Sequence, residues 1–200
     1  MGSEMCIRDR WDYLSWAHRG MKMEGSATYI YFDGSCGENR NVTSETPAGW
    51  GFCVVSGDNG IGRGHGEIVK EKSGVVVTNP LDEEYIGASV GSNNTAELSA
   101  FAHSLIWILK NHDSGKIVIR GDSEYAMNIG SGKWKAKANK ELATRVRSLW
   151  EEVDASFAVS TEHVRAHGGH RWNERADHLA FRAMKEELPL PLQFWKPGKR

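Results

Sequence analysis

Two short apolar runs that each lead into an aspartate, with one long helix between them, place the strongest constraint on the fold. Residues 27–32 are rich in strand-forming residues and precede Asp33, and residues 116–120 precede Asp122 after one glycine. A strand, a helix and a second strand of the same sheet favour a right-handed crossover with parallel, neighbouring strands. Both aspartates would then lie at the carboxyl edge of the sheet, where open α/β proteins place their functional crevice.

The segment between the two runs contains the clearest helix pattern of the chain, at residues 93–110. Its apolar residues recur at the i, i+3, i+4, i+7 spacing of an amphipathic helix. Asn93 or Asn94 is placed to cap the first turn, and Glu97 follows Asn94 at capping-box spacing. Glu97 therefore has two interpretations: a residue that caps the helix, or a third carboxylate at the edge that carries the aspartates.

A fourth carboxylate, Asp177, lies two turns into another helix. An apolar run at residues 157–164 is followed by two glycines, and apolar residues then recur at helical spacing up to Met184. Asp177 falls beside this apolar stripe, at the rim of the core. Alone it would be a solvated aspartate of a charged helix, but three other carboxylates at the same edge favour a cluster.

The whole pattern predicts an α/β domain with a mixed five-stranded sheet, an antiparallel meander followed by parallel strands, flanked by helices. Residues 49–56 and 61–69, joined by a turn, predict the antiparallel strands. Residues 122–129 and a segment that starts at Asn139 predict two further helices. Residues 70–92 are interpreted as an insertion with room for a short extra hairpin.

Composition and periodicity predict one folded domain at residues 26–187. We expect residues 1–25 to be a disordered or extraneous tail, and residues 188–200 to be a proline-rich C-terminal tail. No run approaches the roughly 18 apolar residues of a membrane span. Three scattered cysteines exclude a disulfide framework and suit a reducing compartment, so we expect an intracellular protein, cytoplasmic by default, with nucleus and organelle left open.

Four carboxylates in one place repel one another, and the pKa of some of them would be raised. Divalent cations remove this conflict, and a cluster without histidine or cysteine suits Mg²⁺, with Mn²⁺ as a substitute, better than zinc. Two such ions about 4 Å apart can clamp the attacking water and the leaving oxygen in phosphodiester cleavage. Asp33, Glu97, Asp122 and Asp177 therefore predict a site for two metal ions.

The motifs around these residues resemble those of type 1 ribonuclease H, an enzyme that cuts the RNA strand of RNA/DNA hybrids. Four motifs follow the family's order between residues 27 and 186: Asp33-Gly34-Ser35, Asn93 to Leu98, Gly121 to Tyr125, and Val164 to Asp177. The resemblance implies a ribonuclease H-like fold and a metal-dependent endonuclease that leaves a 5′-phosphate and a 3′-hydroxyl. It also implies that the four carboxylates hold the Mg²⁺ ions.

The resemblance further implies that His167, on the loop before the last helix, assists proton transfer or product release. An ordinary surface histidine in a glycine-rich turn is the alternative. Asn93 and Asn94 match the pair that reads the minor groove of the hybrid, where RNA shows its 2′-hydroxyl groups. Other matches, each of which could instead cap a helix or pack, are a pocket for a DNA-strand phosphate (Ser92 and Asn139) and contacts along the DNA strand (Ser123 and Trp134).

The expected partner is an RNA/DNA hybrid and not a membrane, and we expect a monomer. The formal net charge of −1 does not itself predict a nucleic-acid partner, so binding must depend on a local patch, and on salt. Two rival functions are another nuclease of the same fold, and a non-catalytic nucleic-acid-binding module such as a fragment of a reverse-transcribing element. The asparagine pair argues against the first rival, and four carboxylates that would face phosphates argue against the second.

Overall fold

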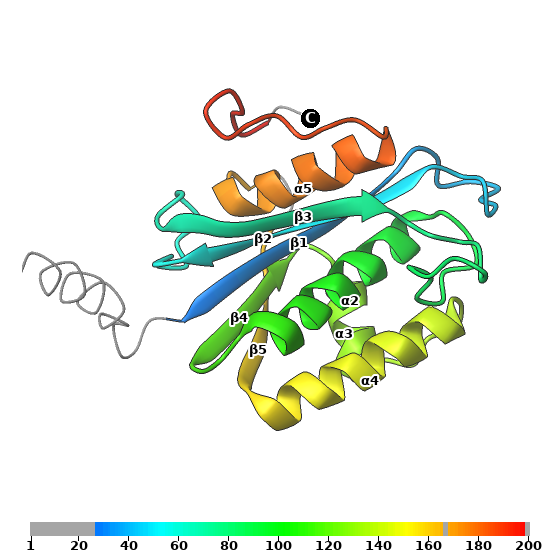
Figure 1. Ribbon diagram of the computed structural model, residues 1–200, viewed down its shortest axis with the longest axis horizontal. Coiled ribbons are helices and arrows are strands. Elements are labelled where there is room, and N and C mark those ends of the chain that lie inside the picture. The colour runs from blue at the N-terminus through cyan, green and yellow to red at the C-terminus, as the bar shows by residue number, and fades with distance from the viewer. Residues whose placement is uncertain (1–26, 166–167, 199–200) are drawn as a thin grey trace, which may run out of the picture.

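The computed structural model describes residues 27–165 and 168–198. It contains a five-stranded sheet with helices on both faces (Figure 1). The strands β1 and β2 run antiparallel, as do β2 and β3, while β1, β4 and β5 are parallel. The order across the sheet is β3-β2-β1-β4-β5, which confirms the predicted mixed sheet. The strand bounds are β1 Thr28–Cys36, β2 Ala48–Ser56, β3 Glu67–Val75, β4 Lys116–Gly121 and β5 Ala158–His163.

The helices cover the two faces unequally. On one face lie α2 (Asn93–Asn111), α3 (Glu124–Gly130) and α4 (Lys140–Ser156), and on the other lies α5 (Arg171–Met184) (Figure 1). The connection β1–α2–β4 is the predicted crossover between parallel neighbours. Because side chains alternate along a strand, β1 contributes to two separate cores.

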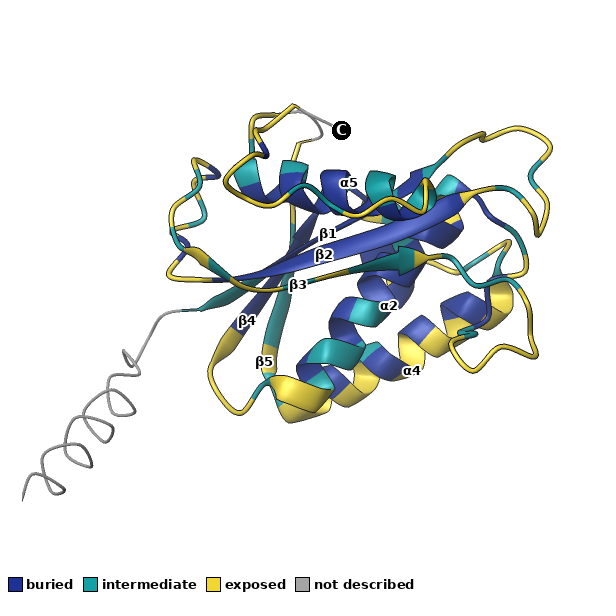
Figure 2. Ribbon diagram, turned by 45° about the horizontal axis from the view of Figure 1, so that its top comes forward, coloured by how far each residue is buried: buried dark blue, intermediate teal, exposed yellow. Residues whose placement is uncertain are grey.

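The two cores differ in size. The larger one lies under α2 and α4 and includes Ile30 and Phe32, and the smaller one lies under α5 and includes Tyr31. Burial is continuous along the central strands and the inner helix faces (Figure 2).

The expected third strand at residues 61–69 is wrong, because β3 starts only at Glu67. Residues 57–66 form a loop, and its five glycines all have positive φ, a conformation that other residues adopt at a cost. The expected extra hairpin is also wrong, since residues 76–92 contain no strand. In addition, β1 continues to Cys36, so that Asp33 lies within the strand and not after it.

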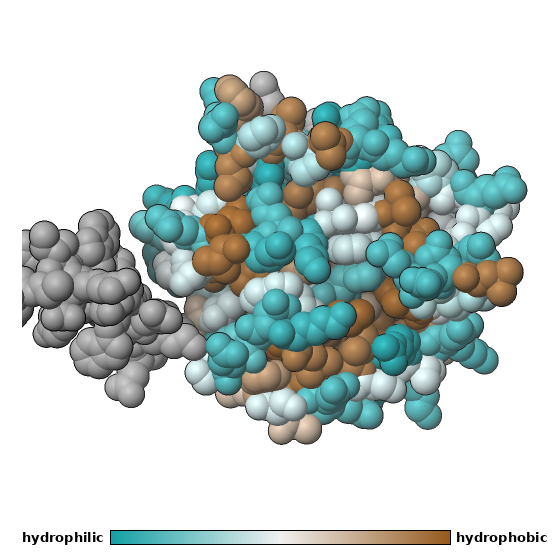
Figure 3. Space-filling model, in the orientation of Figure 1, coloured by the Kyte–Doolittle hydropathy of each residue, from teal (hydrophilic) through white to brown (hydrophobic). Residues whose placement is uncertain are grey.

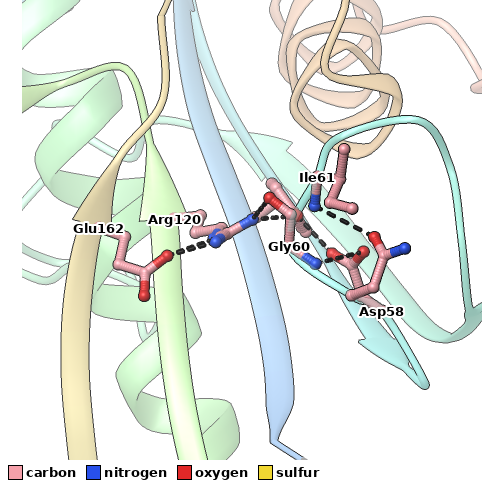
Figure 4. Close-up of polar contacts among 7 residues, drawn as sticks. Asp58, Gly60, Ile61, Arg120 and Glu162 are labelled. Carbon is pink, nitrogen blue, oxygen red and sulfur yellow. Dashed lines mark hydrogen bonds and ion pairs between the residues drawn. The ribbon is translucent and has the colours of Figure 1, made fainter.

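The loop between β2 and β3 is tied to the sheet by a partly buried polar network (Figure 4). Arg120 of β4 donates through Nε to Glu162 Oε2 at 2.9 Å, and through Nη1 to the Gly60 carbonyl oxygen at 2.8 Å. The same Nη1 donates to the Tyr31 hydroxyl at 3.1 Å, and that hydroxyl donates to Asp58. These charge-assisted bonds link the loop to three strands.

The face that carries α2 and α4 has an open hollow of about 1400 Å³. Figure 3 shows apolar surface in this area with hydrophilic groups around it. Inside it the His103 ring stacks on Trp50, with 3.7 Å between ring centroids. Burial lowers the pKa of His103 to about 4, and the charges of Lys72 and Lys110 act in the same direction. None of the four carboxylates lines this hollow, so it is separate from the predicted site.

The chain after α5 folds back over that helix, and Trp195 is only 2% exposed. Within the expected tail at 188–200, Trp195 is thus buried whereas Leu188 and Phe194 are exposed, and the expected N-terminal tail lies outside the described residues. Within residues 27–165 and 168–198, no helix is long and apolar enough to cross a membrane.

Candidate active site

Asp33 is the centre of the predicted carboxylate cluster. It is 8% exposed, and its Oδ1 accepts a hydrogen bond from the Gly34 N–H at 2.7 Å. Burial raises the pKa of Asp33, and the charges of Asp122, Asp177 and Glu97 raise it further against the effect of the Gly34 N–H. All three other carboxylates therefore lie within electrostatic reach of Asp33, as their positions in the sequence predicted.

Two glycines of the sheet allow the helices that carry Glu97 and Asp177 to approach. A Cβ atom at Gly34 would lie 2.3 Å from the Glu97 backbone nitrogen of α2. A Cβ atom at Gly51, which pairs with Asp33 across the strands, would lie 2.6 Å from a backbone nitrogen of α5. Side chains at these positions would push both helices away from the sheet, so glycine is required for the close approach.

The carboxylate of Glu97 is held on both sides. Its Oε2 accepts from the Ser123 hydroxyl at 2.6 Å, and its Oε1 accepts from the Asn93 amide nitrogen at 2.6 Å. Burial raises the pKa of Glu97, the two hydrogen bonds lower it, and the charge of Asp122 raises it, with a raised pKa as the result. The Glu97 carboxylate thus connects the first turn of its own helix with the start of α3.

The expected capping of α2 is wrong, because Ser92 is the N-cap residue. The Ser92 hydroxyl accepts from the Thr95 backbone N–H at 3.1 Å, and the Thr95 hydroxyl accepts from the Ser92 N–H at 2.8 Å. This is a capping box in which Thr95 has the place usually taken by an acidic residue. Glu97 is therefore not needed as a cap and is available to the cluster.

The remaining two carboxylates follow β4 and lie within α5. Asp122 is half-buried and follows β4 directly. Its neighbour Ser123 is the N-cap of α3, where it accepts from Ala126 N at 3.1 Å while it donates to Glu97. Asp177 is half-buried and lies near the middle of α5.

The donor set of the cluster fits hard divalent cations, because it consists of carboxylates alone. In this conformation, however, no group of three or more His, Cys, Asp or Glu side chains in the described part of the chain is arranged to hold a metal ion. The hydrogen bonds of Glu97 to Ser123 and Asn93 account for part of this, since they turn one carboxylate to other partners. The role of the four carboxylates as metal ligands stays a prediction.

The predicted substrate residues are divided between two places. Ser92, which is buried, and Asn93, which is half-buried, lie at the start of α2. Asn94 and Trp134 line a small cavity of about 370 Å³ together with Tyr125, Lys135 and Lys137.

Asn139 precedes α4 in the left-handed conformation, with φ of 53° and no side-chain capping bond. Its side chain instead bonds to Tyr125, the tyrosine that lines the small cavity. Contact of these residues with a substrate stays a prediction. His167 lies outside the described residues.

Several residues outside the predicted set also shape the site. Asn39 accepts from the Asn93 backbone N–H at 3.3 Å, which brings the loop after β1 to the start of α2. The three-residue spacing of Ser92 and Thr95 also fits a capping box. Thr95 could have been found if this pair had been compared with Asn94 and Glu97. No local pattern marks Gly51, since its role depends on a helix more than a hundred residues away along the chain.

Comparison with known proteins agrees with this geometry. The family model described as RNase H matches residues 25–185. Ribonuclease H of Alcanivorax borkumensis is 30% identical over 168 residues, which cover 78% of this chain and 91% of the relative. Ribonuclease HI of Caulobacter vibrioides is 29% identical over 169 residues, which cover 80% and 94%. The crystal structure of RNase H1 from the halophilic archaeon Halobacterium salinarum NRC-1 has a TM-score of 0.57 at 27% identity, and the match covers 80% of this chain and 98% of that one.

The sheet order and the carboxylate edge define a nuclease of the ribonuclease H-like class. The chain belongs to the ribonuclease H family, as an enzyme of type 1. This confirms the resemblance found in the sequence and disfavours a non-catalytic nucleic-acid-binding module.

Proposed function

We propose that this enzyme hydrolyses the RNA strand of RNA/DNA hybrids with two divalent cations, Mg²⁺ or Mn²⁺, and leaves a 5′-phosphate and a 3′-hydroxyl. One observation carries the proposal: Asp33 is buried, and the charges of Glu97, Asp122 and Asp177 raise its pKa. A cluster of this kind is unfavourable without cations, because each carboxylate loses solvation and meets like charge. Family membership supports the assignment of the substrate.

Each carboxylate has a distinct place in this proposal. Asp33 and Asp122 would share the ions, Glu97 would hold one ion, and Asp177 would complete the other. The ions would stabilise the charge that develops on the attacking and leaving oxygens of the phosphodiester. Ser123 is the residue that would steer Glu97, because it is fixed as the cap of α3 and bonds to the Glu97 carboxylate.

The contacts to the hybrid would extend from the start of α2 to the segment before α4. Asn94 is exposed and can offer its amide to a 2′-hydroxyl in the minor groove. Lys135 and Lys137, beside the exposed Trp134, would neutralise phosphates and make binding sensitive to salt. His167 would assist proton transfer or product release, and the enzyme would act as a monomer.

The test is cleavage of an end-labelled RNA/DNA hybrid with Mg²⁺, next to RNA/RNA and DNA/DNA duplexes. We expect cutting of the RNA strand of the hybrid alone, with loss of activity in EDTA and in Asp122→Asn. Asp154→Asn is a matched control, because Asp154 is an exposed aspartate of α4. Cutting of the all-DNA duplex would indicate another nuclease activity, and binding of the hybrid without cutting would refute the catalytic proposal.

A further inference from the structure

Both backbone polar groups of one residue of the C-terminal segment are bonded to α5, on either side of Asp177. The Leu190 N–H donates to His178 Nε2 at 3.0 Å. The Leu190 carbonyl oxygen accepts from Arg175 Nη1 at 2.8 Å. His178 is fully buried and Arg175 is 2% exposed, so water cannot replace either bond without local opening.

Arg175 also ties α5 to the edge strand of the sheet. Its Nε and Nη2 donate to the two carboxylate oxygens of Glu71 on β3, each at 2.8 Å. This two-point pairing fixes the orientation of the guanidinium group as well as its distance from the carboxylate. One buried side chain therefore connects α5, β3 and the C-terminal segment.

An aromatic residue covers these bonds. Trp195 is 2% exposed, and the guanidinium carbons of Arg171 and Arg175 lie 5.4 and 5.3 Å from its ring centroid. The ring centroid of His178 lies 6.1 Å from that of Trp195. Leu190, Trp195, Arg175 and His178 thus form one connected unit, which we call the brace.

The place of the brace along α5 suggests what it does. Asp177 lies between Arg175 and His178 in the sequence, so the rotation and height of α5 set where its carboxylate stands relative to Asp33. The carboxylates of the cluster repel one another, and this repulsion acts to move α5 off the sheet. A helix held by buried bonds on the side of the C-terminal segment resists that movement.

We propose that the brace positions Asp177 for divalent-cation binding, with Arg175 and His178 as positioning residues that touch neither substrate nor ion. The inference rests on the proposed function, because it assumes that Asp177 is a ligand. Residues that orient metal ligands typically change metal affinity by about 10–100-fold when they are replaced. Loss of a brace contact should therefore weaken Mg²⁺ binding by a factor in this range.

Three single variants separate positioning from general packing. His178→Ala removes the acceptor for the Leu190 N–H, while His178→Gln keeps an acceptor at a similar distance from the backbone of α5. Phe194→Ala changes an exposed residue of the same segment and is the control. Calorimetric titration with Mg²⁺, well below the unfolding temperature, should show binding at least about 10-fold weaker in His178→Ala, with near wild-type affinity in the other two.

Amide hydrogen exchange in α5 gives a readout that does not depend on metal. Exchange should be faster in His178→Ala than in His178→Gln, in EDTA. If His178→Ala does not fold, Leu190→Pro, which removes the N–H donor and leaves His178 in place, takes its role in both measurements. Equal exchange rates in the tested variant and the wild type would overturn the proposed role of the brace. If the wild type binds Mg²⁺, an equal Mg²⁺ affinity in the variant would overturn it as well. A wild type that binds no Mg²⁺ and cuts no hybrid would instead overturn the proposed function, and exchange would still decide on the brace.

Discussion

Replacement of Gly34 by alanine should disable the enzyme without unfolding it. The added Cβ atom would lie 2.3 Å from the Glu97 backbone nitrogen, and α2 would have to retreat by about 1.1 Å to reach the 3.4 Å at which ordinary van der Waals contact begins. The φ angle of Gly34 is not in the left-handed region, so the effect is steric. Overpacking of this kind typically costs about 1–3 kcal/mol. A misplacement of about 1 Å at a catalytic group can reduce the rate by about 100-fold.

Two measurements test this prediction. The turnover number for hybrid cleavage with Mg²⁺ should fall by about 100-fold in Gly34→Ala, while urea unfolding shows a loss of only about 1–3 kcal/mol. Gly37→Ala is the control, because a Cβ atom there meets its nearest neighbour at 3.7 Å, in the loop that follows the same strand. Wild-type turnover in Gly34→Ala would refute the argument that close approach of α2 places Glu97.

Three further predictions follow from the charges and caps of the site. In EDTA, Asp33→Asn should raise the free energy of unfolding at pH 7 but not at pH 3. The pKa of Asp33 is raised in the folded state, so ionisation of this residue destabilises the fold once the pH exceeds the pKa of an ordinary carboxyl group. With Mg²⁺ present, the same variant should not cleave the hybrid. Between pH 6.5 and pH 4, the free energy of unfolding of the wild type should fall by up to about 3 kcal/mol relative to that of His103→Phe, because burial lowers the pKa of His103 to about 4. A difference between the two proteins that does not change with pH would contradict this. Ser123→Ala removes the cap of α3 and should lower the free energy of unfolding, measured in urea, by about 1 kcal/mol. It should also reduce turnover, because Glu97 loses a hydrogen-bond partner. Unchanged turnover would show that Ser123 is only a cap.

The fold was predictable where local pattern and topology agree. The run before Asp33, the helix at 93–110 and the run before Asp122 have strong local signals, and the handedness of crossovers then determines how they associate. The edge strand β3 was misplaced because its residues alternate weakly and include Lys70 and Lys72. Its conformation depends on pairing with β2, and such tertiary context outweighs strand propensity.

The site was predictable at the level of residue type and less so at the level of contacts. The four carboxylates could be identified because each follows a recognisable strand or lies in a recognisable helix. The cap at Ser92 was missed because Glu97 fits the acidic capping rule better than Thr95 does. The pairing of Glu71 with Arg175 joins residues that lie far apart along the chain, and no local pattern indicates it.

The opposing forces at the sheet edge provide a way to tell ligands from positioning residues. Burial and like charge make the ionised forms of Asp33 and Glu97 unfavourable in the ion-free fold, whereas the close approach at Gly34 and Gly51 and the bonds of Arg175 hold the helices in place. Removal of the charge of Asp33 or Glu97 should therefore lower activity and raise stability in EDTA. Removal of a glycine or a brace contact should lower both. The sign of the change in unfolding free energy, set beside the loss of cleavage, assigns each residue to one of the two groups.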